Sequence, residues 1–570
     1  HPTTISVSQL LSRILRDAGR HDEAIAMARS LVEVQSERLG ESHPATVEMM
    51  RELATQLSKA GEYEESVERW RRVIDLSREH LGPAHPQTFT ALQELADALA
   101  GLDRMEEVLP LDREVLQRSE ETYGPEHRQT LRARLNLAQS ESAVGRFDES
   151  RPRLTALLEI YEERDGATAP ATRDVLQSLG RLEDKAGRVD EAVVVWRRLV
   201  DACEAETGAD SAETIEAVSK LVAAVAKSGD HEAALPLDRR IYEHRLRTSG
   251  EGTPETLEAK RILAVTSHRA GRSDEAITLF REVIAEAPPA IATHARASLA
   301  AVLETSRRYD ESIPLRRRVA ETARETAGDD PTAPIRSLTD LVLALVEVGD
   351  WAGAAETDRE ILERLIDGGD EDQAKLCRAG RNLTSSLRRA GKVAEAEEVG
   401  RATLERSRET HGPDAAETLQ AEVDLALVSE EAGDVDAAER GLVAILERGR
   451  ATDGKGLDGV IDRATAALAN IELESGRAED AVRRLEERLE EMGDAASRIL
   501  WLRHGEALAA LGRHEEAEAR YLGFLERLGA SSLRDRRLAW RRLASLYADW
   551  GRPDDAARYE RRLDGRSEEG

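Results

Sequence analysis

The sequence predicts an all-α fold, an α-solenoid built from about fourteen helical hairpins. Three observations predict it: the composition, a repeat of mostly 42 residues and a glycine turn in almost every copy. Aromatic residues make up 3% of the 570 residues and charged residues 34%, and Ala, Leu, Glu and Arg dominate. This composition favours helices throughout. A repeat that continues along the chain has no single core that would limit its length.

The turn signature defines the period. A glycine is followed, after a short polar spacer, by an acidic residue and a small one, as in "AGRHDEA" and "AGRSDEA". We expect each turn to join the two helices of a hairpin. The aligned turns, mostly 42 residues apart and twice 36, fall at Gly19, Gly61, Asp103, Gly145, Gly187, Gly229, Gly271, Arg307, Gly349, Gly391, Gly433, Gly476, Gly512 and Gly551.

The first helix of each hairpin has its own start signal. "HPAT" at residues 43–46 and "HPQT" at 85–88 match the opening "HPTT" at 1–4. Pro can occupy the first helical position, where its missing N–H is not needed, and Thr begins the first turn. His43, His85 and His127 share one place in the register but lie on separate rungs, so they cannot converge on one metal ion. We therefore interpret them as part of the helix start.

Small residues predict where the two helices of a hairpin meet. Eight residues before the turn stands a leucine, usually followed by a small residue, as in Leu53-Ala54. Five residues after the turn a second small residue recurs, as in Ser66 and Ala192. A bulky residue beside a small one gives a knob and a close-approach point for a neighbouring helix. A glycine at 40, 82, 124, 166, 208 and 250 is expected to end the second helix.

These motifs, with loops such as "LGESHPAT" and "LGPAHPQT", make the chain resemble the tetratricopeptide family, in the 42-residue variety of kinesin light chains and their bacterial relatives. The resemblance implies a right-handed superhelix whose first helices line a concave groove that binds peptides or protein segments. It also implies a bulky residue in each second helix. That residue is present as Trp70, Trp196, Phe280 and Tyr521, but Asp112, Asp238 and Asp358 replace it in three hairpins, where we expect looser packing.

Two breaks in the period divide the array. The predicted parts are an N-terminal array with HPxT-type loops (1–287), a middle array (288–448) and shorter repeats with a cap (449–570). The paired prolines of "APPA" must end a helix, and "GRATDGKGLDGV" at 449–460 is rich in glycine. Trp540, Trp550 and Tyr559 are expected to cap the last hairpin, because a terminal repeat has no successor to cover it.

Charge and motif content argue against several functions. The net charge of -30 argues against nucleic acid as a partner. No long apolar run or signal peptide is visible, so we expect no membrane contact and a cytoplasmic location. Walker, GxSxG, HExxH and CxxC motifs are absent, and we predict no catalytic residue, cofactor or metal site. Cys203 and Cys377 are expected to be free thiols.

One basic stretch is the candidate binding site. By the resemblance, groove-facing side chains stand about thirteen, ten, six, three and two residues before each turn. The stretch "AKLCRAGRNLTSSLRRAG" at 374–391 contains five basic residues and no acidic one. Arginine forks bind carboxylates in bidentate fashion, so the expected ligand is an acidic peptide or a C-terminal carboxylate. The alternative is pairing with acidic residues of neighbouring helices. The candidate partner-binding residues are Arg336, Arg378, Arg381, Asn382, Ser385, Arg388 and Arg389.

The sequence thus predicts a non-enzymatic scaffold that holds protein partners in a preorganised groove. The alternative is a regulatory region of a larger bacterial signalling enzyme, a serine/threonine kinase or switch ATPase, with its catalytic domain upstream of residue 1. The start within a repeat favours that alternative. Self-association through uncapped ends is a third hypothesis.

Overall fold

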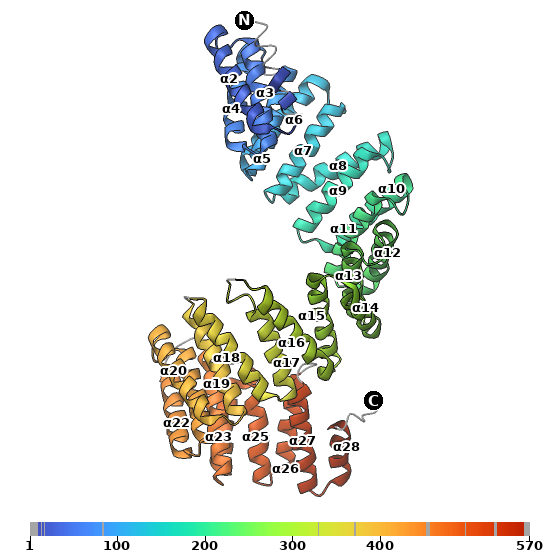
Figure 1. Cartoon of the computed structure of the whole chain (residues 1–570). Helices are drawn as coiled ribbons and strands as arrows, with labels where there is room; N and C mark the ends of the chain where they lie inside the picture. The colour runs from blue at the N-terminus through green and yellow to red at the C-terminus, as the bar shows by residue number, and fades with distance from the viewer. Residues whose placement is uncertain are drawn as a thin grey trace. The chain divides into compact units, whose positions relative to one another are not determined.

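Antiparallel helical hairpins follow one another in a computed structural model of the chain (Figure 1). The predicted all-α solenoid is confirmed, and the described residues contain no strand. The opening "HPTT" lies outside the described residues. Those residues are 10–12, 14–15, 18–82, 85–328, 330–369, 372–451, 456–495, 497–528 and 533–563.

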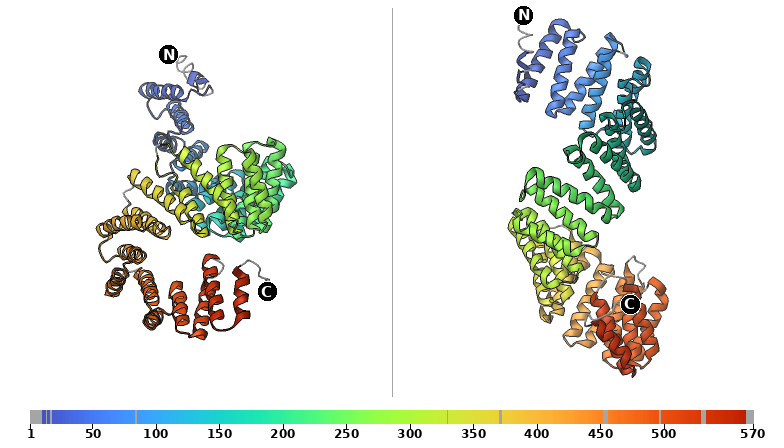
Figure 2. Two further views of the ribbon diagram at one scale, coloured as in Figure 1. Left: turned by 60° about the horizontal axis from the view of Figure 1, so that its bottom comes forward. Right: turned by 90° about the vertical axis from the view of Figure 1, so that its right-hand side faces the viewer.

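The chain forms two units, residues 1–279 and 280–570. Within each unit consecutive helices lie side by side (Figure 2). The first unit contains α2 (His21–Leu39), α3 (Pro44–Ala60), α4 (Tyr63–His80), α5 (Pro86–Gly101), α6 (Met105–Tyr123), α7 (Arg128–Ala143), α8 (Phe147–Asp165), α9 (Pro170–Lys185), α10 (Val189–Thr207), α11 (Ala212–Ser228), α12 (His231–Ser249) and α13 (Pro254–Arg269). The boundary falls within α14 (Ser273–Glu286).

The second unit continues the same alternation. It contains α15 (Pro289–Thr305), α16 (Tyr309–Thr326), α17 (Ile335–Val348), α18 (Trp351–Asp367), α19 (Gln373–Arg389), α20 (Val393–His411), α21 (Ala416–Glu431), α22 (Val435–Ala451), α23 (Leu457–Glu474), α24 (Ala478–Met492), the 3-10 turn η1 (Gly493–Ala495), α25 (Arg498–Ala510), α26 (His514–Leu528), α27 (Leu533–Asp549) and α28 (Pro553–Leu563). The paired prolines separate α14 from α15, as predicted. The division into three parts stays a prediction.

The turn prediction is confirmed at every position. All fourteen turn residues have positive φ, which glycine adopts without a steric penalty. Asp103 (φ 58°) and Arg307 (φ 61°) are the non-glycine residues in this conformation within the described chain. The backbone therefore makes the same left-handed bend even where the sequence does not favour it.

The helix-start interpretation is also confirmed. The Nδ1 atom of His43 accepts a hydrogen bond from the N–H of Ala45 at 3.2 Å, and His85 and His127 do the same two residues ahead. Thr46 donates its hydroxyl to the Gly40 carbonyl oxygen at 2.9 Å, which ties the helix start to the end of the preceding helix. These contacts satisfy backbone groups that a helix end leaves open.

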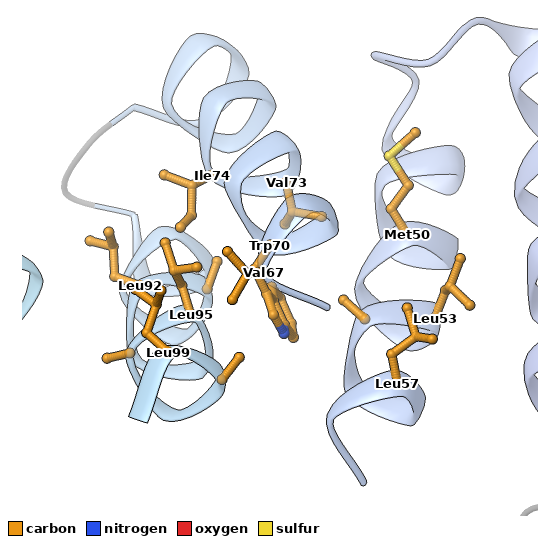
Figure 3. Packing of buried hydrophobic residues seen from close by; sticks show 14 of the residues in the cluster. Met50, Leu53, Leu57, Val67, Trp70, Val73, Ile74, Leu92, Leu95 and Leu99 are labelled. Carbon is orange, nitrogen blue, oxygen red and sulfur yellow. The ribbon is translucent and has the colours of Figure 1, made fainter. Parts of the chain in front are cut away.

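The core lies between successive hairpins. Figure 3 shows Leu53 of α3 and Leu95 of α5 on either side of Trp70 from α4. Trp70 is 1% exposed and Leu53 is fully buried. The predicted small residues allow this close packing: Ser66 is fully buried and donates to the Ala54 carbonyl oxygen at 3.0 Å. Burial of one such leucine contributes roughly 1.5–3 kcal/mol.

Three hairpins make a polar contact where the bulky residue was expected, and the looser packing predicted for them stays a prediction. Asp112, Asp238 and Asp358 are buried, and each accepts a hydrogen bond from a hydroxyl of the next hairpin. A hydrogen bond thus closes the contact between helices where other hairpins use a bulky side chain.

Candidate functional site

First helices of successive hairpins line a hollow in each unit. In the first unit, residues of α5, α7 and α9 surround a hollow of about 480 Å³, which we call the N-terminal groove. In the second unit, residues of α19, α21, α23 and α25, with Trp351, surround one of about 650 Å³, which we call the C-terminal groove. Both volumes lie within the range of about 300–1,000 Å³ typical of binding sites.

Two of the predicted arginines already have acidic partners across the helices. Arg381 of α19 contacts Asp424 of α21, with Nε and Oδ2 3.1 Å apart. Asp424 is 5% exposed and also accepts a hydrogen bond from Arg463 of α23. Asp424 therefore joins three first helices. Arg388 pairs in the same way with Glu431 of α21.

Arg389 lies in a different environment from Arg388. Its guanidinium stands over the ring of Trp351, 4.7 Å from the ring centroid, at the edge of the C-terminal groove. The cation–π attraction holds this guanidinium at the groove edge. Arg388 and Arg389 line this groove, whereas the other predicted site residues do not.

The remaining predicted residues divide by exposure. Arg336 of α17 and Arg378 of α19 are exposed and form no ion pair within the described residues. Asn382 is exposed and Ser385 is partly buried on α19. The open cations of the predicted set are therefore Arg336 and Arg378, while Arg381 and Arg388 are held by carboxylates.

Sequence reasoning missed the residues that complete this network. Asp424 lies 43 residues after Arg381, and Glu431 lies 43 residues after Arg388. A separation of one repeat plus one residue places the two side chains on neighbouring first helices. That repeated spacing was the available signal.

The N-terminal groove combines both signs of charge. Glu94 and Asp97 come from α5, and the cations Arg132, Arg181 and Lys185 come from α7 and α9. Burial raises the pKa of Glu94 and of Asp97; the Asp97 charge raises the pKa of Glu94 further, and Arg132 partly offsets the effect at Asp97. Asp97, Arg132, Arg181 and Lys185 stand at predicted groove positions of their own hairpins, and Glu94 stands one residue from such a position. They were not among the predicted site residues.

The floor of this groove is polar. Asp112 of α6 is 5% exposed, and its Oδ2 accepts a hydrogen bond from the Ser140 hydroxyl at 2.5 Å. Burial raises the pKa of Asp112 to about 6, although the Ser140 bond opposes the shift. Gln139 of α7 donates to Ser178 of α9 at 2.9 Å and links these two helices. Such a surface can bind polar or charged groups of a ligand.

Other chemistry receives no support from the described residues. In that part of the chain no group of three or more His, Cys, Asp or Glu side chains is arranged to hold a metal ion. No helix there has the length and apolarity required to span a membrane.

Comparison with known proteins identifies the repeat. Three models described as tetratricopeptide repeat match the chain, together over more than half of its length. One matches residues 3–79, 87–163 and 135–205, the second 220–291 and 466–532, and the third 378–414. No curated protein sequence matches this chain.

Solved structures with similarity include a Podosopora anserina protein with "kinesin light chain nearly identical TPR-like repeats". It is 23% identical, the match covers 36% of this chain and 97% of that one, and the TM-score is 0.33. BtubC (BKLC) from P. vanneervenii is 22% identical, with 40% and 92% covered and a TM-score of 0.34. The family models match repeats in both units of the chain, in agreement with the hairpins and turns described above. The chain belongs to the tetratricopeptide repeat family.

Proposed function

We propose that this chain is a non-enzymatic scaffold that captures protein segments on the face formed by its first helices. The observation that carries the proposal is that first helices of consecutive hairpins line a hollow in each unit with charged and polar side chains. A stack of packed hairpins presents these side chains in fixed positions, so a ligand is bound with little loss of conformational freedom in the scaffold. We place this function in the cytoplasm, where the buried thiols of Cys203 and Cys377 would stay reduced.

We further propose that the arginines of α17 and α19 bind an acidic segment or a C-terminal carboxylate. Arg336 and Arg378 supply the open charges, and Asn382 and Ser385 supply hydrogen-bonding groups beside them. Arg389 is held on Trp351 at the groove edge. Arg381 and Arg388 contribute by holding α19 against α21 through Asp424 and Glu431.

The test uses the full chain and a fluorescein-labelled tetraglutamate peptide, followed by fluorescence anisotropy. The combined change Arg336→Glu and Arg378→Glu is expected to weaken binding by about tenfold or more, a loss of about 1.4 kcal/mol. Equal affinity of the variant and the wild type would contradict the proposed site. An amidated version of the peptide distinguishes recognition of the terminal carboxylate from recognition of the side chains.

The matched control is Arg440→Glu on α22, a second helix. Arg440 is exposed and forms no ion pair within the described chain. Its reversal changes the net charge without changing the first-helix face, so binding is expected to remain within about twofold of the wild type. An equal loss in the control would mean that the peptide responds to net charge alone.

A further inference from the structure

We propose that the N-terminal groove binds a protein segment that carries both signs of charge, a lysine or arginine side chain against α5 and a carboxylate against α7 and α9. This inference rests on the proposed function, that the array captures protein segments. It goes beyond that function by assigning a second binding surface and the chemistry of its ligand.

The α5 side has no directly paired cation, although Lys59 and Arg51 oppose the rise in the pKa of Glu94, and Arg132 opposes that of Asp97. Glu94 and Asp97 stand three residues apart on this helix, and neither forms a hydrogen bond or ion pair within the described residues. Burial raises the pKa of both groups, which means that their surroundings disfavour the carboxylate charge. A cationic side chain placed between them would stabilise both charged forms. The chemistry that fits this side is therefore an ammonium or guanidinium group.

The α7 and α9 side has no directly paired anion. Arg132 of α7 and Arg181 and Lys185 of α9 are exposed and form no ion pair in the described chain. Arg181 and Lys185 are four residues apart, so they stand on one face of α9. A carboxylate fits this side.

Second helices in this part of the array behave differently. Arg71 of α4 pairs with Glu107 of α6, and Arg113 of α6 pairs with Glu149 of α8, each across 36 residues. Arginines on that face thus find carboxylates of the next hairpin. The unpaired cations of the groove are therefore not explained by the composition of the chain, because arginines of the second helices do find carboxylate partners.

The floor between the two sides offers an acceptor. Asp112 is 5% exposed and lines the hollow. Its Oδ2 accepts the Ser140 hydroxyl, and no hydrogen bond to its Oδ1 is present within the described residues. Because Asp112 lines the hollow, a ligand N–H that reaches Oδ1 would make a hydrogen bond to it. Asp112 is an independent feature that favours a ligand in this hollow.

The separation of the two signs gives selectivity. A segment with acidic residues alone meets the carboxylates of α5, and a segment with basic residues alone meets the cations of α7 and α9. Like charges brought together at a binding surface suppress the wrong partner. The order of the two signs along the ligand should matter too, because the two sides lie on different helices.

The probes are four fluorescein-labelled peptides of equal length, measured by anisotropy with the full chain. Two mixed peptides have the orders Lys-Lys-Ala-Ala-Ala-Glu-Glu and Glu-Glu-Ala-Ala-Ala-Lys-Lys. In the two single-sign peptides, all four charged positions are Lys in one and Glu in the other. One mixed order is expected to bind about tenfold more tightly than either single-sign peptide. If neither mixed peptide binds better than both single-sign peptides, the inference is wrong.

Variants locate the binding. Asp97→Asn and Arg181→Gln are each expected to weaken the mixed peptide by about fivefold, because each removes one charge of opposite sign. The control Arg197→Gln on α10, an exposed second-helix residue, should leave binding unchanged. If neither Asp97→Asn nor Arg181→Gln changes the affinity of the mixed peptide, the assignment to this groove is wrong.

Failure of this inference can be told apart from failure of the proposed function. If tetraglutamate binds in a manner sensitive to Arg336→Glu and Arg378→Glu while the mixed peptides do not discriminate, the scaffold function stands and the N-terminal assignment is wrong. If no peptide binds at the arginines of α17 and α19 or at the N-terminal groove, both are wrong.

Discussion

The hydroxyl of Ser140 on α7 donates to the buried carboxylate of Asp112 on α6 at 2.5 Å. The same pairing joins Thr266 to Asp238 at 2.6 Å and Ser386 to Asp358 at 2.7 Å, each across 28 residues. At the same two register positions, other hairpins have Trp70 with Ala98 and Trp196 with Ala224. In these five hairpins the contact with the next hairpin therefore uses either a large ring opposite a small residue or an aspartate opposite a hydroxyl.

This pairing predicts the effect of removing one partner. Ser140→Ala should lower the free energy of unfolding by about 1–3 kcal/mol, because it leaves a buried carboxylate without its donor. Asp112→Leu combined with Ser140→Ala should recover most of that loss, because both partners become apolar. Another hairpin already has an apolar pair, Leu154 and Leu182, at the equivalent positions. Urea denaturation followed by circular dichroism measures both. A double variant no more stable than Ser140→Ala would contradict the pairing argument.

The buried aspartates predict a dependence on pH. Burial raises the pKa of Asp358 to about 6, with Ser386 opposing the shift, while an unfolded aspartate titrates near pH ~3.9. The folded state therefore binds the proton more tightly, and this group adds stability as the pH falls from about 7 to about 4. Asp358→Asn should remove that gain. Hydrogen exchange of α18 and α19 between pH 7.5 and 5 tests it, and an unchanged pH dependence in the variant would contradict the assignment.

His504 predicts the opposite trend at the C-terminal end. It stands eight residues before Gly512, where all the other hairpins have leucine. The ring is 1% exposed, neither nitrogen has a hydrogen-bond partner, and Glu486 stands 3.5 Å from Nε2. Burial, with Arg520 and Arg513 adding to the effect, lowers the pKa of His504 to about 4. The folded state disfavours the protonated ring, so stability is lost as the pH falls from about 6.5 to about 4.

His504→Leu should therefore make α25 and α26 more stable, with a larger gain at pH 5 than at pH 7.5. Hydrogen exchange of these helices at the two pH values gives the comparison. His21→Leu, at an exposed position on α2, serves as a control and should leave the pH dependence of α25 unchanged. An equal gain at both pH values would mean that the ring is not the titrating group.

The turn at Asp103 predicts a stabilising substitution. A residue with a Cβ atom in the left-handed conformation destabilises the folded state by roughly 1–2 kcal/mol. Glycine removes this strain, but its greater conformational freedom in the unfolded chain offsets about half of the gain. Asp103→Gly should thus raise the free energy of unfolding by about 0.5–1 kcal/mol. Gly145→Asp is the reverse exchange at an equivalent turn, where an added Cβ would meet no atom within 4 Å. It should lower stability by a similar amount, and a thermal melt compares the two. If both changes move the midpoint in the same direction, backbone strain is not the cause.

The turns were predictable because their cause is local. Glycine at Gly145 and the equivalent turns indicates a positive φ directly, and a small residue such as Ser66 indicates a close contact between helices. The pairing of Arg381 was not predictable in the same way, because it depends on which face of α21 presents Asp424. The 28-residue pairing of Asp112 with Ser140 was visible as a pattern, but its meaning required knowing that both positions are buried.

Arg381 therefore predicts a structural effect that Arg378 should lack. Asp424 is 5% exposed and is held by Arg381 and Arg463. Arg381→Gln removes one of two charged donors from a buried carboxylate, and we expect a loss of about 1–3 kcal/mol in the free energy of unfolding. Arg378→Gln, at an exposed position on the same helix, should cost less than about 0.5 kcal/mol. Urea denaturation of the two variants gives the contrast: equal stability would mean that Arg381 is free to bind a partner, whereas the expected difference assigns Arg381 to holding α19 against α21 and leaves Arg378 to the ligand.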